Sequence, residues 1–211
     1  MKATSKKGIE RGLAALLLAT LIAATPAAAQ SPSQVVDGLA SQVIGILKNT
    51  ALDSQQKRTQ IENIAYNAID FPTLSKLVLA RNWPKFSPTQ RSEFEQEFKQ
   101  HLSMTYGRNV DNYKNEKVQI LGERPEQHDD VTVQTKILRG GGSDDVVVDY
   151  RLRQTSGQWK IIDVIIEGVS LVSNFRSQFQ DVVSNGGPEQ LLSLLREKNA
   201  KGEPLKGAPA T

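Results

Sequence analysis

The chain has 211 residues, a length that allows one large domain or two small ones. It contains 26 Lys and Arg against 23 Asp and Glu, and the resulting formal charge of +3 and pI of about 9.1 suggest a nucleic-acid or anionic-membrane partner. Cys is absent, which excludes a disulfide scaffold, a thiolate nucleophile and an iron–sulfur cluster. The two histidines, His101 and His128, lie too far apart for a local metal motif, so we expect no metal and no cofactor.

The N-terminal segment has the pattern of a secretory signal peptide. An apolar run at positions 13–24 follows a basic stretch and ends in a small-residue pattern at Ala27 and Ala29. The run is shorter than the roughly 20 residues that a transmembrane helix needs. We therefore predict a signal peptide over residues 1–29, cleavage between Ala29 and Gln30, and a periplasmic location.

The basic charge belongs to this segment. Residues 1–29 hold four of the 26 basic residues and one of the 23 acidic residues, so the remaining chain has 22 of each and no net charge. A neutral protein has no overall field to hold it on nucleic acid or on an anionic lipid surface. We predict no nucleic-acid partner and only transient contact with membranes.

Helical periodicity follows the predicted cleavage site. Helices are expected to begin after four polar N-caps: Ser31, Asp53, Asp70 and Ser87. Ser31 and Ser87 precede a Pro suited to the first turn, and a Gln three residues after Asp53 and Ser87 completes a capping box. Two further helices are predicted near the C-terminus, one after Gly168 and one beginning at Pro188.

Between these helical regions the apolar period changes to two. Four strands are predicted, over residues 116–121, 131–139, 146–154 and 158–166. The connections are too short for parallel crossovers, which favours an antiparallel meander. Alternation places Val133, Val148 and Tyr150 on an apolar face and Asp149 and Arg151 on the other.

The predicted fold class is α+β, with a helical layer packed on a four-stranded antiparallel sheet. The fourth strand is apolar on both faces, so helices or a ligand should cover it twice. Residues 30–198 form one domain, and the Gly/Pro/Ala/Lys-rich segment 199–211 is predicted to be disordered.

Asp163 is the candidate catalytic residue, because it is a carboxylate within this otherwise apolar strand. An unpaired carboxylate there would be costly. One interpretation is an acid/base site of the ketosteroid-isomerase type, with Tyr150 nearby. The other is a structural carboxylate satisfied by an Arg or by backbone and hydroxyl donors. A third hypothesis is that the protein is a non-catalytic scaffold whose apolar residues form only a packed core.

Three segments resemble the MlaC family, the periplasmic phospholipid-binding or toluene-tolerance auxiliary family. They are the stretch at 70–83 (DFPTLSKLVLARNW), the Ser-Pro-Thr-Gln-Arg run at 87–91 with Phe94 and Phe98, and the strand-to-helix segment at 159–179 (WKIIDVIIEGVSLVSNFRSQF). The resemblance covers about residues 33–198.

The resemblance implies a soluble shuttle that maintains outer-membrane lipid asymmetry. Its cargo would be a glycerophospholipid, carried between an outer-membrane lipoprotein–porin complex and an inner-membrane ABC-transporter complex. It also implies an NTF2-like related sheet and helical layer that enclose an apolar lipid pocket, and no hydrolysis by the shuttle itself. The alternative remains an NTF2-like periplasmic enzyme that uses Asp163 as acid/base.

Such cargo constrains the pocket. Two acyl chains contain roughly 30 methylenes, whose exposure to water would cost over about 20 kcal/mol, so the pocket should approach or exceed about 1,000 Å³. Arg81 and Arg176 are expected at the headgroup rim, and Asp163 and Gly168 are expected to be structural. The expected lipid-binding residues are large or apolar side chains of the helices and strands: Phe71, Leu74, Val78, Trp83, Phe94, Phe98, Leu102, Tyr106, Val133, Val148, Tyr150, Val164, Val169, Val172 and Phe175.

Overall fold

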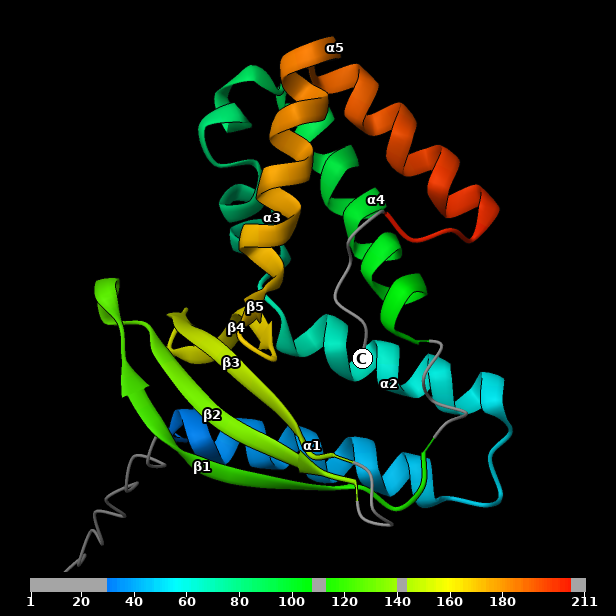
Figure 1. Ribbon diagram of the computed structural model, residues 1–211, viewed down its shortest axis with the longest axis vertical. Helices are drawn as coiled ribbons and strands as arrows, with labels where there is room; N and C mark the ends of the chain where they lie inside the picture. The colour runs from blue at the N-terminus through cyan, green and yellow to red at the C-terminus, as the bar shows by residue number, and fades with distance from the viewer. Residues whose placement is uncertain (1–29, 108–112, 140–143, 206–211) are drawn as a thin grey trace, which may run out of the picture.

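A computed structural model describes residues 30–107, 113–139 and 144–205 (Figure 1). The predicted signal peptide and residues 206–211 lie outside this part of the chain. The helices are α1 (Pro32–Lys48), α2 (Ser54–Ala68), α3 (Phe71–Leu79), η1 (Ala80–Lys85), α4 (Pro88–Tyr106), η3 (Gln127–Asp129) and α5 (Leu171–Lys201). The strands are β1 (Lys117–Pro125), β2 (Val131–Leu138), β3 (Val146–Thr155), β4 (Gln158–Ile166) and β5 (Val169–Ser170).

The predicted helix starts are confirmed. Ser31, Asp53 and Ser87 each form a complete capping box, in which the cap side chain and the Gln three residues later satisfy each other's backbone N–H. Asp70 accepts the backbone N–H of Thr73 at 3.0 Å and caps α3. Local capping chemistry therefore sets where the first four α-helices begin.

The sheet is an antiparallel meander in the order β1-β2-β3-β4-β5, so the prediction of four strands is wrong by one. The fifth strand has only two residues and pairs Val169 with Ile166. Glu167 (φ 49°) and Gly168 (φ 80°) connect β4 to β5, and two successive positive φ values are typical of a type I′ hairpin turn. Gly168 thus turns the chain into another strand before α5 begins.

The two faces of the sheet are those that the alternation predicts. The register pairs Tyr150 with both Val133 and Val164, which places the three side chains on one face. It pairs Arg151 with Thr132 and Asp163 on the other. We call these the α1 face, because α1 packs on it, and the polar face.

The molecule has two halves, each with its own apolar core (Figure 1). In the lower half of the view, the sheet packs with α1, and α2 runs beside α1. In the upper half, α3, α4 and α5 pack together around a core of aromatic rings. β1 extends four residues beyond its predicted end, past a bulge between Ile120 and Gly122.

Asp70 links the two halves. Its backbone N–H donates to the carbonyl of Ile161 at 3.0 Å, and its carboxylate accepts the hydroxyl of Thr155 at 2.8 Å. Burial alone would raise the pKa of Asp70, but hydrogen bonds from Thr73 and Thr155 outweigh it, so the pKa is lowered. A charged carboxylate therefore fixes the start of α3 on the β3–β4 hairpin.

The C-terminal boundary differs from the expected one. The predicted helix start at Pro188 is confirmed, because the non-helical residue Gly187 (φ 73°) divides α5 into two helices just before it, and the second helix ends at Lys201. Residues 199–205 were expected to be disordered, yet the helix runs through Asn199 and Leu205 is buried in the helical core. The apolar side chain of Leu205 and the polar partners of Asn199 explain this order.

His101 holds this segment in place. Its ring is fully buried, its Nδ1 lies 3.1 Å from Oδ1 of Asn199, and its Nε2 accepts the backbone N–H of Leu205 at 3.3 Å. An Nε2 that accepts a hydrogen bond carries no proton, so the folded state contains neutral imidazole.

The free energy of unfolding is expected to fall as the pH drops below about 6.5. Burial is the main cause that lowers the pKa of His101, and the charge of Lys198 adds to it. The unfolded state therefore binds a proton that the folded state does not, and stability declines between the unfolded and the folded pKa. Urea unfolding at pH 7.5 and 5.5 measures the effect, and His101→Gln should reduce the difference. An equal pH dependence in this variant would contradict the assignment.

Candidate functional site

The α1 face of the sheet carries an apolar surface that the surrounding helices cover incompletely. Four residues, Val36, Val133, Leu152 and Ile161, are buried at its centre. Around them lie partly buried side chains: Val35, Leu39, Ala68, Ile69, Ile120, Tyr150, Trp159 and Val164. We call these twelve residues the α1-face cluster.

α2 forms the open side of this cluster. The helix contains no buried residue, although Ile61, Ile64, Ala65 and Ala68 recur along one stripe and are all half-buried. An apolar stripe normally becomes buried against its neighbour. Its partial exposure here shows that α2 stands next to the cluster without sealing it.

An open pocket of ≈ 400 Å³ lies between α1, α2 and the β3–β4 turn. We call it the apolar recess. Its apolar lining includes Val35, Leu39, Ile64, Ala68 and Trp159, and its polar lining consists of amide side chains and Lys160. Lys160 Nζ donates to the carbonyl of Asn67 at 2.8 Å, which ties β4 to the end of α2.

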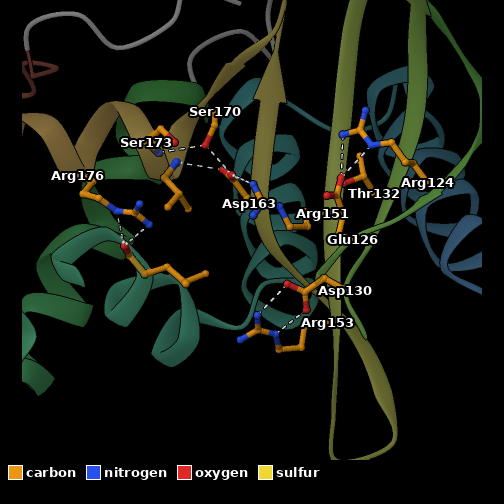
Figure 2. A network of polar contacts seen from close by, with 12 residues as sticks. Arg124, Glu126, Asp130, Thr132, Arg151, Arg153, Asp163, Ser170, Ser173 and Arg176 are labelled. Atoms are coloured by element: carbon orange, nitrogen blue, oxygen red, sulfur yellow. Dashed lines mark hydrogen bonds and ion pairs between the residues drawn. The ribbon is translucent and has the colours of Figure 1, made fainter. Parts of the chain in front are cut away.

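A second pocket of ≈ 490 Å³ lies on the polar face. It is lined by Leu77 and Ile162 together with charged and polar side chains, among them Asp130, Arg151 and Arg153. Arg153 contacts Asp130 through Nε and Nη2 at 2.6 and 2.8 Å, and this bidentate bond raises the pKa of Arg153 (Figure 2). The carboxylates and guanidinium groups of this pocket are paired with one another or with neighbouring residues. Its lining is therefore mainly charged, whereas that of the apolar recess is apolar side chains and amides with one lysine.

Asp163 has the contacts of a structural carboxylate. Its side chain is 1% exposed, Oδ2 accepts Arg151 Nη2 at 2.9 Å and Ser170 Oγ at 2.6 Å, and Oδ1 accepts the backbone N–H of Val172 at 3.0 Å (Figure 2). These donors occupy both oxygens. The acid/base interpretation requires a carboxylate that a substrate can reach, and the observed contacts favour the structural one.

The residues expected to form one lipid-binding wall fall into separate regions. Nine of them lie in the helical core of α3, α4, α5 and η1: Phe71, Leu74, Val78, Trp83, Phe94, Phe98, Leu102, Val172 and Phe175. Three belong to the α1-face cluster: Val133, Tyr150 and Val164. Val148 is buried on β3, Tyr106 is half-buried at the end of α4, and Val169 is 44% exposed on β5.

The helical group is a packed core. Phe98 lies 5.4 Å from Phe94 and 5.1 Å from Phe175, measured between ring centroids, and all three rings are at most 1% exposed. Aromatic rings at these separations fill one another's space. These side chains therefore contact each other rather than an open pocket.

Neither expected rim arginine lines the apolar recess. Arg176 donates through Nε and Nη2 to the carbonyl of Leu77 at 3.0 and 2.8 Å, where it caps the last turn of α3 (Figure 2). Arg81 is exposed on η1, in the helical half. Sequence reasoning omitted the residues of α1 and α2 that do line the recess. The apolar stripe of α2 was the available signal.

Two properties of the described residues bear on the class of protein. No group of three or more His, Cys, Asp or Glu side chains in that part of the chain could hold a metal ion. In the same residues, every helix is too short or too polar to span a bilayer.

The fold is a five-stranded antiparallel meander with helices packed beside it. An apolar recess opens between two of these helices and the sheet. These features are those of a small α+β protein that binds a ligand beside its sheet. The chain belongs to the MlaC family, whose model, described as "MlaC protein", matches residues 37–197.

Two curated relatives match most of the chain. The toluene tolerance protein ttg2D of Pseudomonas putida is 29% identical over 85% of this chain and 84% of its own length. The intermembrane phospholipid transport system binding protein MlaC of Haemophilus influenzae is 23% identical over 86% of this chain and 88% of its own length.

A solved structure has the same fold. The phospholipid-binding protein from Ralstonia solanacearum, determined in complex with a phospholipid, is 28% identical and has a TM-score of 0.71. The match covers 80% of this chain and 96% of that chain.

Proposed function

We propose that the chain is a periplasmic phospholipid-binding shuttle and not an enzyme. The observation that carries this proposal is the phospholipid bound to the Ralstonia solanacearum protein, which has the same fold over nearly its entire length. The apolar surface left open between α1, α2 and the sheet supports it, since it supplies side chains suited to acyl chains.

In this proposal the α1-face cluster and the stripe of α2 hold the acyl chains. The recess measures ≈ 400 Å³, less than the volume of about 1,000 Å³ that two chains require. Loading therefore requires α2 to move away from the sheet. α2 is suited to this because none of its residues is fully buried, so its movement costs only the partial packing of side chains such as Ala68 and the Lys160–Asn67 hydrogen bond.

The finer parts of the proposal concern location and partners. Cleavage between Ala29 and Gln30 would leave Gln30 next to Ser31, the cap of α1, so the mature chain would enter its first helix at once. The shuttle would exchange a glycerophospholipid with an outer-membrane lipoprotein–porin complex and an inner-membrane ABC-transporter complex, and so maintain outer-membrane lipid asymmetry. The balanced charge of residues 30–211 suits brief contact with both.

Denaturing mass spectrometry of the purified protein tests the proposal. Wild-type protein is expected to release glycerophospholipid, and Ile64→Glu to release at least tenfold less, because a carboxylate in the recess would be desolvated by acyl chains. Asn63→Glu is the matched control. Asn63 is exposed on the same helix, so this substitution introduces the same charge outside the recess.

Lipid-free wild-type protein that takes up no phospholipid from liposomes would refute the carrier function. Equal lipid content in Ile64→Glu and Asn63→Glu would instead show that the acyl chains lie elsewhere.

A further inference from the structure

Tyr150 places a hydroxyl group in the middle of an otherwise apolar surface. Its cross-strand neighbours on the α1 face are Val133 and Val164, and Val148 and Leu152 flank it along β3. The side chain is only half-buried and packs against the buried centre of the α1-face cluster. Tyr150 does not line the apolar recess itself, but it belongs to the α1-face cluster, which the proposed function assigns to the acyl chains.

Nothing in the described part of the chain satisfies this hydroxyl. Burial is the sole cause that raises the pKa of Tyr150, and neither a hydrogen bond nor a neighbouring charge contributes. The phenol therefore keeps its proton at physiological pH and can donate a hydrogen bond. A buried donor without a partner costs about 1–3 kcal/mol, so a ligand that covers Tyr150 should bring an acceptor.

The residues around Tyr150 indicate which chemical group of a ligand would accept this hydrogen bond. The four neighbours named above are apolar, and Thr135, which pairs with Val148, already donates its hydroxyl to the carbonyl of that residue. A phosphate at this point would be desolvated without a cation, at high cost. A neutral carbonyl is compatible with an apolar surface, and in a glycerophospholipid the carbonyls are the two esters between the acyl chains and the headgroup.

From this geometry we infer that the Tyr150 hydroxyl donates a hydrogen bond to an ester carbonyl of the bound lipid and makes the site selective for ester-linked over ether-linked chains. The inference rests on the proposed function. It adds a specificity determinant, because a residue of the sheet distinguishes how the chains are linked to glycerol.

Competition binding with paired lipids tests it. Diacyl and dialkyl phosphatidylethanolamine of equal chain length displace a fluorescent phospholipid from lipid-free protein. Wild type is expected to bind the diacyl form about tenfold more tightly, because the dialkyl form leaves the hydroxyl unpaired. Tyr150→Phe should bind both forms equally and unfold at the same denaturant concentration as wild type, since the folded protein uses the hydroxyl for no internal bond.

Tyr113→Phe is the matched control. It removes a hydroxyl that donates to the carbonyl of Glu116 before β1, and it should keep the wild-type preference. Equal binding of both lipids by wild type, or an unchanged preference in Tyr150→Phe, overturns the inference and leaves the proposed function standing. Failure of wild type to bind either lipid overturns the proposed function itself.

Discussion

Replacing Asp163 with Ala is expected to lower the free energy of unfolding by about 3–5 kcal/mol. The substitution leaves the guanidinium of Arg151 without its carboxylate and the backbone N–H of Val172 without an acceptor. Because Asp163 is 1% exposed, water does not replace the lost partners without disrupting the junction between β4 and α5. The free energy is measured by urea unfolding monitored by far-UV circular dichroism.

Two further variants make this result specific. Asp163→Asn keeps one acceptor oxygen and should lose less stability than Asp163→Ala. Asp37→Ala removes an exposed carboxylate from α1 and should change the free energy of unfolding by less than about 0.5 kcal/mol. An Asp163→Ala protein as stable as wild type would contradict the structural role and reopen the acid/base interpretation.

The sequence predicts local structure well because the responsible contacts are local. A capping box spans four residues, and strand alternation depends only on successive side chains, so the starts of α1, α2 and α4 and the two faces of the sheet follow from the chain itself. β5 could not be predicted because a strand of two residues is too short to show the alternation of apolar and polar side chains. The order of residues 199–205 was not predicted because it depends on His101, which lies 98 positions from Asn199 and 104 from Leu205 in the chain.

The candidate site could be predicted only in part, for a related reason. Helical spacing shows that Phe98 and Ile64 each belong to an apolar stripe, but it does not show which surface covers that stripe. Phe98 meets other aromatic rings, whereas Ile64 borders an open recess. Likewise, an Arg beside apolar residues suggests a headgroup contact, but the guanidinium of Arg176 donates to the carbonyl of Leu77 in the last turn of α3.

Phe98→Ala is expected to lower the free energy of unfolding by about 3–5 kcal/mol and the melting temperature by roughly 6–20 °C. The ring of Phe98 contacts those of Phe94, Phe175 and Phe179, with centroids 5.1 to 5.5 Å apart, so its removal leaves a cavity among three fixed neighbours. Differential scanning calorimetry measures the change.

Leu39→Ala is the informative comparison, since it truncates a partly buried side chain that lines the apolar recess. It should cost less stability than Phe98→Ala, because less of its surface is buried, and should lower the phospholipid content of the folded protein. Phe98→Ala, kept well below its melting temperature, should retain its phospholipid. The opposite result, a stable Phe98→Ala protein without lipid, would place the acyl chains in the helical half and assign the aromatic cluster to the lipid-binding wall.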